Sequence, residues 1–189
     1  AAKAGAETRA KLGAELAQYG ITGQQQTAAL QLADDFYTQS KDYFTQADAI
    51  KKISASAQRI QSERKSGGDS PAANIALVFN FMKMLDPTST VREGEQAQAS
   101  QAAGVPDRIL AQYNRIVNGG RLTDGQVNDF LSTAAAQYRS ADTDHRGRIT
   151  DFTNRATMLR VPPALVVREP DPSLLKIGQS AKSKWDERQ

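Results

Sequence analysis

Apolar residues recur every three or four positions through the first half of this chain, with polar residues between them. Such spacing places the apolar side chains on one face of a helix. No proline or glycine interrupts residues 24–66, and Thr22 is suited to be an N-cap before them. We therefore predict one long helix over 24–66. Its apolar stripe is Leu30, Ala33, Tyr37, Phe44, Ala47, Ile50, Ile53, Ala57 and Ile60, with Ser40 in the one gap.

A second long stripe follows Thr123, which stands in the relation of a capping box to Gln126. The spacing predicts a helix over 123–160, and Val161-Pro162-Pro163 ends it. Gly147 costs this helix about 1 kcal/mol relative to alanine, which would suit a bend or the close approach of another backbone. The stripe is Val127, Leu131, Ala134, Tyr138, Ala141, His145, Arg148, Phe152, Ala156 and Leu159.

The most apolar part of the chain lies between the two long helices. Ser70 and Pro71 predict a helix start, and Asp86-Pro87 predicts its end because a proline cannot donate to the preceding turn. This helix is apolar almost all round, so we expect it to form the core. Shorter helices are predicted over 3–18, over 91–103, and from Pro106 to the Asn118-Gly119-Gly120 stop, the last with an apolar face of Ile109, Tyr113, Ile116 and Val117.

We find no alternation of period two, so the expected fold class is all-α. The predicted architecture is an elongated bundle of two long antiparallel helices with shorter helices between them. We divide the chain into a helical module over 1–160 and an extended, proline-rich C-terminal arm over 161–189, which either docks on a neighbour or is a free tail. A monomer this thin cannot cover all of its apolar stripes, which predicts self-assembly.

The composition fits long exposed helices, with 39% hydrophobic and 6% aromatic residues. The net charge is +3, and charges of both signs are interleaved, so no basic face for strong autonomous DNA binding stands out. The absence of cysteine excludes disulfides and thiolate metal sites. The longest apolar run, 75–85, contains Asn80 and Lys83 and is shorter than the roughly 20 residues that span a bilayer.

Two places in the sequence carry titratable groups close together and are therefore candidates for chemical sites. His145 is the only histidine and lies near Asp142 and Asp144, but a single imidazole without a second clustered ligand indicates a packed residue. Glu93 and Glu95 are two residues apart, so a helix would point them to different faces, whereas the carboxylates of a glycosidase flank one bond. They are better explained as stabilising a helix N-terminus.

The remaining candidates also favour structural roles. Glu63 lies near a helix end with no apolar pocket to raise its pKa. The pairs Gly67-Gly68 and Gly119-Gly120 lack the Lys-Ser/Thr of a phosphate loop and are predicted as hinges between helices. The tyrosines are expected to pack rather than to stack on bases: Tyr19, Tyr37, Tyr43, Tyr113 and Tyr138. The sequence thus assigns no catalytic, cofactor-binding or metal residue, and we expect a protein that is not an enzyme.

One segment resembles a family. The motif KMLDPTSTVREGE over 83–95, then AGVPDRI over 103–109 and GGRLTDGQ over 119–126, is similar to a segment that recurs in structural proteins of tailed bacteriophages. It resembles their internal or DNA-ejection proteins, and also large virion proteins that carry a lytic transglycosylase elsewhere. The resemblance covers about 73–138, and its motif carries no catalytic residue that could be transferred to this chain.

The resemblance implies a structural virion protein that assembles in multiple copies near the portal or tail and assists genome ejection. Implied partners are further copies, other virion proteins of the portal, tail or ejection apparatus, and genomic DNA through non-specific contact, with no small-molecule ligand and no cofactor. The implied location is the capsid interior, portal or tail lumen, and the host periplasm or envelope after ejection.

Two alternatives stay open. The chain would be a neck, tail or chaperone-like interaction module that is never ejected, or a non-catalytic domain of a phage wall-degrading protein. The first residue is not methionine, and we expect these 189 residues to be one ordered part of a longer polypeptide.

Overall fold

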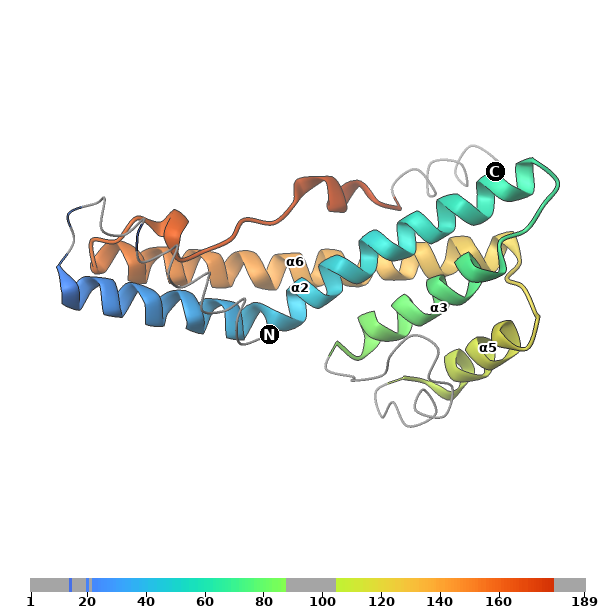
Figure 1. Ribbon diagram of the computed structural model, residues 1–189, viewed down its shortest axis with the longest axis horizontal. Helices are drawn as coiled ribbons and strands as arrows, with labels where there is room; N and C mark the ends of the chain where they lie inside the picture. Colours follow the sequence, from blue (N-terminus) through green and yellow to red (C-terminus); the bar gives the residue numbers. More distant parts are fainter. Residues whose placement is uncertain (1–13, 15–19, 21, 88–104, 179–189) are drawn as a thin grey trace. The chain divides into compact units, whose positions relative to one another are not determined.

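The computed structural model describes residues 14, 20, 22–87 and 105–178 (Figure 1). These residues form α-helices and short 3₁₀ helices without a strand, which confirms the predicted all-α class. The α-helices are α2 (Gly23–Lys65), α3 (Pro71–Leu85), α5 (Asp107–Val117) and α6 (Asp124–Met158), and the 3₁₀ helices are η1 (Pro163–Leu165) and η2 (Pro172–Lys176). The helix predicted over 91–103, and all but one residue of that over 3–18, lie outside the described residues.

The chain divides into two compact units, and both long helices contribute to each. Unit 1 takes its described residues from Ala1–Lys41 and Asp142–Pro170, and unit 2 from Asp42–Ala141 and Asp171–Gln189. This division differs from the predicted module over 1–160 and arm over 161–189. The residues that follow α6 are divided between the units. Residues 161–170 belong to unit 1 and include the buried Val161 and Val166, whereas residues 171–178 belong to unit 2 and include the buried Leu174.

In unit 1 the first part of α2 runs antiparallel to the last part of α6. The Gln25 side-chain amide donates to the Leu159 carbonyl at 3.1 Å, and the Phe36 ring meets the Phe152 ring edge-on at 5.4 Å. At the start of α2, the Thr22 N–H donates to the Gln25 side chain and the Gln25 N–H to the Thr22 hydroxyl. Thr22 is therefore the N-cap, as predicted, and its bonds form a complete capping box.

The buried stripe at the start of α2 is one residue out of register with the predicted one. Ala29, Leu32 and Phe36 are buried, whereas Tyr37, which was predicted to face inward, is 63% exposed. One residue along a helix is a rotation of about 100°. Burial of phenylalanine covers no polar atom, whereas burial of the neighbouring tyrosine would require a partner for its hydroxyl. Farther along, the predicted positions Ile50, Ile53, Ala57 and Ile60 are buried.

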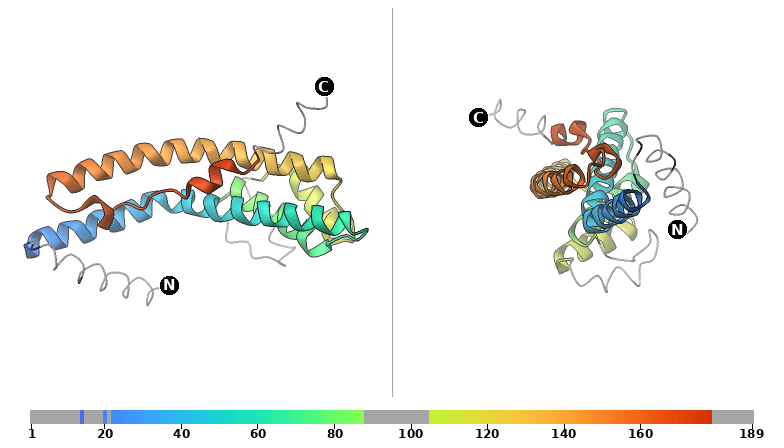
Figure 2. Two further views of the ribbon diagram at one scale, coloured as in Figure 1. Left: turned by 90° about the horizontal axis from the view of Figure 1, so that it is seen from above. Right: turned by 90° about the vertical axis from the view of Figure 1, so that its left-hand side faces the viewer.

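Unit 2 has its own hydrophobic core, and α3 lies beside α5 within it (Figure 1). Helix α3 begins and ends at the predicted residues and is buried on most sides, as its composition predicted. The segment 171–178 belongs to the same unit (Figure 2). Its Leu174 joins the core, and its Asp171 carboxylate lies 3.6 Å from the Lys51 ammonium.

The described residues cover most of their apolar stripes within their own chain, contrary to the expectation that neighbouring chains would do so. Among them, the large hydrophobic side chains that stay exposed are Tyr37 and Met158. The arm was expected to dock on a neighbour or to be free, but Val161, Val166 and Leu174 are buried in this chain. Self-assembly stays a prediction. Because these apolar faces are already buried within the chain, they do not by themselves require a second copy.

The helices α2, α5 and α6 end with the same pair of backbone hydrogen bonds. In this motif the residue just after the helix adopts the left-handed conformation. That residue is Gly67 after α2 and Gly119 after α5, with φ of 78° and 90°. After α6 it is Arg160, with φ of 56°, and the Val161 N–H donates to the Ala156 carbonyl at 2.9 Å. A side chain in this conformation costs about 1 kcal/mol.

We expect Arg160→Gly to raise the free energy of unfolding by about 1 kcal/mol, because glycine adopts this conformation without steric strain. Thermal and urea unfolding followed by circular dichroism measure the change. Gly67→Ala is the matched control at the end of α2 and should lower stability by a similar amount. A neutral or destabilising Arg160→Gly would contradict the assignment of strain to Arg160.

Candidate functional site

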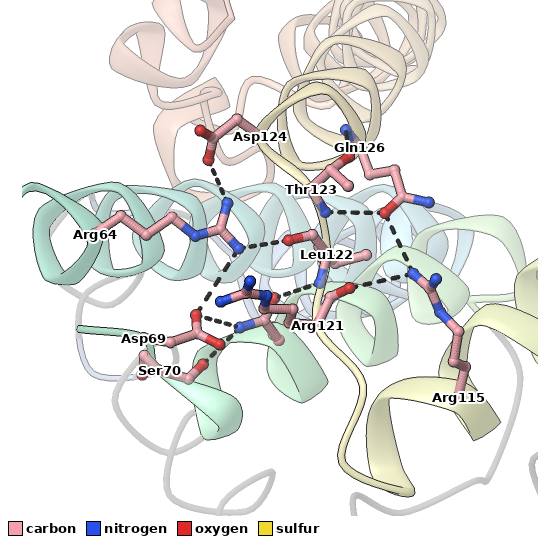
Figure 3. A network of polar contacts seen from close by, with 10 residues as sticks. Arg64, Asp69, Ser70, Arg115, Arg121, Leu122, Thr123, Asp124 and Gln126 are labelled. Carbon is pink, nitrogen blue, oxygen red and sulfur yellow. Dashed lines mark hydrogen bonds and ion pairs between the residues drawn. The ribbon is translucent and has the colours of Figure 1, made fainter. Parts of the chain in front are cut away.

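A network of polar side chains joins the end of α2, the start of α3 and the start of α6 in unit 2 (Figure 3). The Arg64 guanidinium donates to the Leu122 carbonyl and to the Asp124 carboxylate, and lies 3.8 Å from the Asp69 carboxylate. Its side chain is only 20% exposed. A planar guanidinium can hold several oxygen atoms at once, so this residue fixes three chain segments together.

Asn74 is the fully buried member of this network. Its amide nitrogen donates to the Asp69 carboxylate at 3.2 Å and to the Ser70 carbonyl at 2.8 Å, and its amide oxygen accepts from the Leu122 N–H at 3.0 Å. Ser70 precedes α3 as predicted, but its hydroxyl forms no capping hydrogen bond. The Asn74 amide secures this helix start instead, and it also satisfies a buried backbone donor of a distant segment.

The other half of the network joins the end of α5 to the start of α6 (Figure 3). Arg115 donates to the Arg121 carbonyl at 3.2 Å and to the Gln126 side-chain oxygen at 3.3 Å. That oxygen also accepts from the Thr123 N–H at 2.9 Å, while the Gln126 N–H donates to the Thr123 hydroxyl. The predicted capping box is therefore confirmed, and Arg115 extends it to a second helix.

The glycine pairs end helices in this structure, and neither lies at a phosphate-binding loop after a strand. Gly67 and Gly119 have positive φ, and an added Cβ at Gly120 would lie 2.7 Å from the Arg115 carbonyl oxygen. Gly147 was predicted to suit a bend or the close approach of another backbone. Apart from its own stretch of α6, no described residue has an atom within 4 Å of where its Cβ would lie. α6 continues through it without interruption.

Two of the tyrosines form a buried pair between α2 and α6 of unit 2. The hydroxyls of Tyr43 and Tyr138 are 2.7 Å apart, and their rings stack with centroids 5.8 Å apart. Tyr113 is buried with its ring 6.5 Å from that of Phe79. These three pack as predicted, and Tyr19 lies outside the described residues.

We expect Tyr43→Phe and Tyr138→Phe each to lower the free energy of unfolding by about 1 kcal/mol, because each removes the hydrogen bond and leaves the other hydroxyl buried. The double variant should be less destabilised than the sum of the two. A double-mutant cycle in urea unfolding measures this coupling. Strict additivity would show that the two hydroxyls do not stabilise each other.

Unit 1 holds a separate group of buried polar side chains: Ser40, Asp142 and His145. Asp142 accepts from the Arg146 guanidinium at 2.7 Å, one turn along α6. His145 has no exposed surface, and its ring centroid lies 5.5 Å from that of Phe36. Burial lowers the pKa of His145 most strongly, and the backbone of Arg168 acts in the opposite direction.

Serine, histidine and aspartate in one core have the residue types of a hydrolase triad, but their burial argues against that chemistry. Ser40 and His145 are completely covered, whereas a nucleophile must reach a scissile bond. Glu63 forms an ion pair with the exposed Arg59 at 2.9 Å and is itself partly exposed. Glu93 and Glu95 lie outside the described residues. The arrangement can position helices, and its buried imidazole can respond to protons.

Within 22–87 and 105–178, no three histidine, cysteine, aspartate or glutamate side chains come together as ligands for a metal ion. No helix in this part of the chain combines the length and apolar character needed to cross a membrane.

Comparisons with protein-family models, curated proteins and solved structures found no match for this chain.

Sequence reasoning did not identify Arg64, Asn74 or Arg115, which organise the network. Asn74 carried a weak signal, because it is a polar residue in the first turns of a mostly apolar helix. Arg64 and Arg115 carried no such signal, because the backbone carbonyls to which they donate lie 58 and 6 residues away along the chain.

Proposed function

We propose that this chain is a structural virion protein of a tailed bacteriophage, assembling in multiple copies near the portal or tail and assisting genome ejection. The proposal rests on the resemblance of residues 73–138. The observation that supports it is how this segment uses its polar groups. Asn74, Arg115 and Gln126 bind backbone groups at helix ends of the same unit. Side chains used in this way stabilise a scaffold and are not directed at a substrate.

The buried titratable groups of unit 1 support the same reading. They are covered by the packed helices, so they have no route to a polymeric substrate such as peptidoglycan. The exposed Tyr37 and Met158 offer apolar contacts to further copies or to other virion proteins. A net charge of +3 with interleaved signs fits non-specific contact with DNA better than sequence-specific binding.

The proposal is tested by following the protein through infection. Purified particles should contain several copies of the chain, measured by quantitative mass spectrometry against the major capsid protein. After adsorption, the host envelope or periplasm should gain the chain while the emptied particle loses it. The capsid protein, which stays outside the cell, is the internal control. Absence of the chain from purified particles would overturn the proposal.

The same fractions separate the alternatives. Retention of the chain in emptied particles would favour a neck, tail or chaperone-like module that is not ejected. Muramidase activity of the purified chain on isolated peptidoglycan would contradict a non-enzymatic role. Light scattering of the purified chain tests self-assembly, and a monomer at every concentration would remove that part of the proposal.

A further inference from the structure

Residues 171–178, which we call the docking segment, are held against unit 2 at three points. Near the start of the segment, the Asp171 carboxylate lies 3.6 Å from the Lys51 ammonium of α2. In its middle, Leu174 is 5% exposed and belongs to the core of the unit. At its end, Gly178 lies so close to α6 that an added Cβ would be 2.9 Å from the Ala135 Cβ. The docking segment therefore contacts both long helices of this unit.

The docking segment also covers apolar surface. Leu175 and Ile177 are partly buried and pack against the same core as Leu174. Undocking would expose these three side chains together with the apolar surface beneath them, which is unfavourable in water. The segment and its docking face therefore need each other, or the equivalent surfaces of another molecule.

The stretch that leads into the docking segment does not fix which molecule the segment docks on. Residues 167–171 lie in no helix, and Pro170 and Pro172 lack a backbone N–H with which to hold the chain in place. Before them, the Arg168 backbone interacts with His145 of unit 1. Between Arg168 and Leu174 an extended chain spans about 20 Å, so the segment can reach a second copy alongside while unit 1 stays packed.

We propose that two copies of this chain exchange their docking segments, so that each segment packs on unit 2 of the other copy. The contacts seen within one chain are then all remade between chains: Asp171 with Lys51, Leu174 with the core, and Gly178 with Ala135. Because the exchange is reciprocal, it closes a two-fold dimer and leaves no docking face empty. The inference rests on the self-assembly part of the proposed function and names the surface that forms the assembly.

The closed chain and the exchanged dimer contain the same docking contacts, so concentration decides between them. A segment on a short flexible connection meets its own docking face at an effective concentration of roughly 1 mM. Exchange therefore becomes substantial when the copies themselves approach that concentration, as several copies gathered at one site would do. In dilute solution the chain should be a closed monomer.

The ion pair between Lys51 and Asp171 allows exchange to be detected in the chain without any substitution. A carbodiimide joins an ammonium to a carboxylate that lies beside it, as these two groups do at 3.6 Å. Equal amounts of unlabelled chain and of chain labelled with heavy nitrogen are unfolded and then refolded together at roughly 1 mM. The dimer is isolated by size-exclusion chromatography, cross-linked and digested. We expect about half of its Lys51–Asp171 links to join a light peptide to a heavy one.

Lys52 and Asp48 are the control within the same sample. They form an ion pair at 2.7 Å on the same helix, so their link stays within one chain whether or not the docking segments exchange. A mixed-label fraction at Lys51–Asp171 no higher than at this control would overturn the proposal, while self-assembly through another surface could still hold. Absence of any dimer at this concentration would overturn both. The virion role is tested separately, by the location of the chain during infection.

Charge reversal provides a second test. In Lys51→Asp or Asp171→Lys alone, the pair is repulsive both in the closed chain and in a dimer of identical copies. When the two variants are mixed, exchange between unlike chains creates two attractive pairs that neither closed monomer can form. We therefore expect the mixed dimer to have a dissociation constant about tenfold lower, at low salt, than the dimer of either variant alone.

Lys52→Asp mixed with Asp171→Lys is the matched control. Lys52 forms its ion pair with Asp48 of its own helix, so this mixture should show no such gain in dimer affinity. Analytical ultracentrifugation measures the dissociation constants. A gain that is absent from the first mixture, or equal in the two mixtures, would overturn the proposal.

Discussion

Phe36→Ala is expected to lower the free energy of unfolding of unit 1 by about 4 kcal/mol. The side chain is 2% exposed and contacts the rings of Phe152 and His145, with centroids 5.4 and 5.5 Å away. Its removal loses apolar burial and leaves a cavity between two rigid helices. Urea unfolding followed by circular dichroism measures the loss, and hydrogen exchange locates it in unit 1.

Tyr37→Ala is the matched control for this prediction. Tyr37 is the next residue, is also aromatic, and is 63% exposed. Truncation of a surface side chain usually changes stability by less than about 0.5 kcal/mol. The pair of variants therefore tests the register of α2 directly. A larger loss for Tyr37→Ala than for Phe36→Ala would restore the stripe expected from the sequence and contradict the structure.

Asn74→Ala is expected to lower the free energy of unfolding of unit 2 by about 3 kcal/mol. It removes three hydrogen bonds, and it leaves the buried N–H of Leu122 without its acceptor. The segment before α6 should also become less protected, because Asn74 joins it to the start of α3. Urea unfolding measures the first effect, and hydrogen exchange at Leu122 measures the second.

Asn80→Ala is a control on the same helix with the same change in side chain. Asn80 is also buried, but its side-chain amide donates to the Ala76 carbonyl of its own helix, at 2.7 Å. In this variant the Ala76 carbonyl keeps its helical partner, and alanine favours a helix. We therefore expect the free energy of unfolding to fall by less than about 1 kcal/mol. Equal losses at both positions would show that the bond to Leu122 contributes little.

The virion role rests on residues 73–138, whose described part belongs to unit 2, and it is tested by where the chain is found during infection.

Local features of the sequence were sufficient to predict the helices. The start of α3 after Ser70, its end before Asp86-Pro87, the capping box at Thr123 and the helix ends at the two glycine pairs all agree with the structure. These signals operate within a few residues, through backbone restriction and short-range hydrogen bonds. They need no knowledge of the rest of the fold.

The amino-acid sequence by itself thus determined the all-α class, the ends of the described helices and the face that α6 buries. Only the tertiary structure decided that Phe36 rather than Tyr37 faces the core, that residues 161–178 pack on their own chain, and that Arg64 and Asn74 join distant helix ends. The physical reason is the range of the interactions. Helix propensity and capping depend on neighbours in sequence, whereas burial and the pairing of polar groups depend on side chains that only folding brings together.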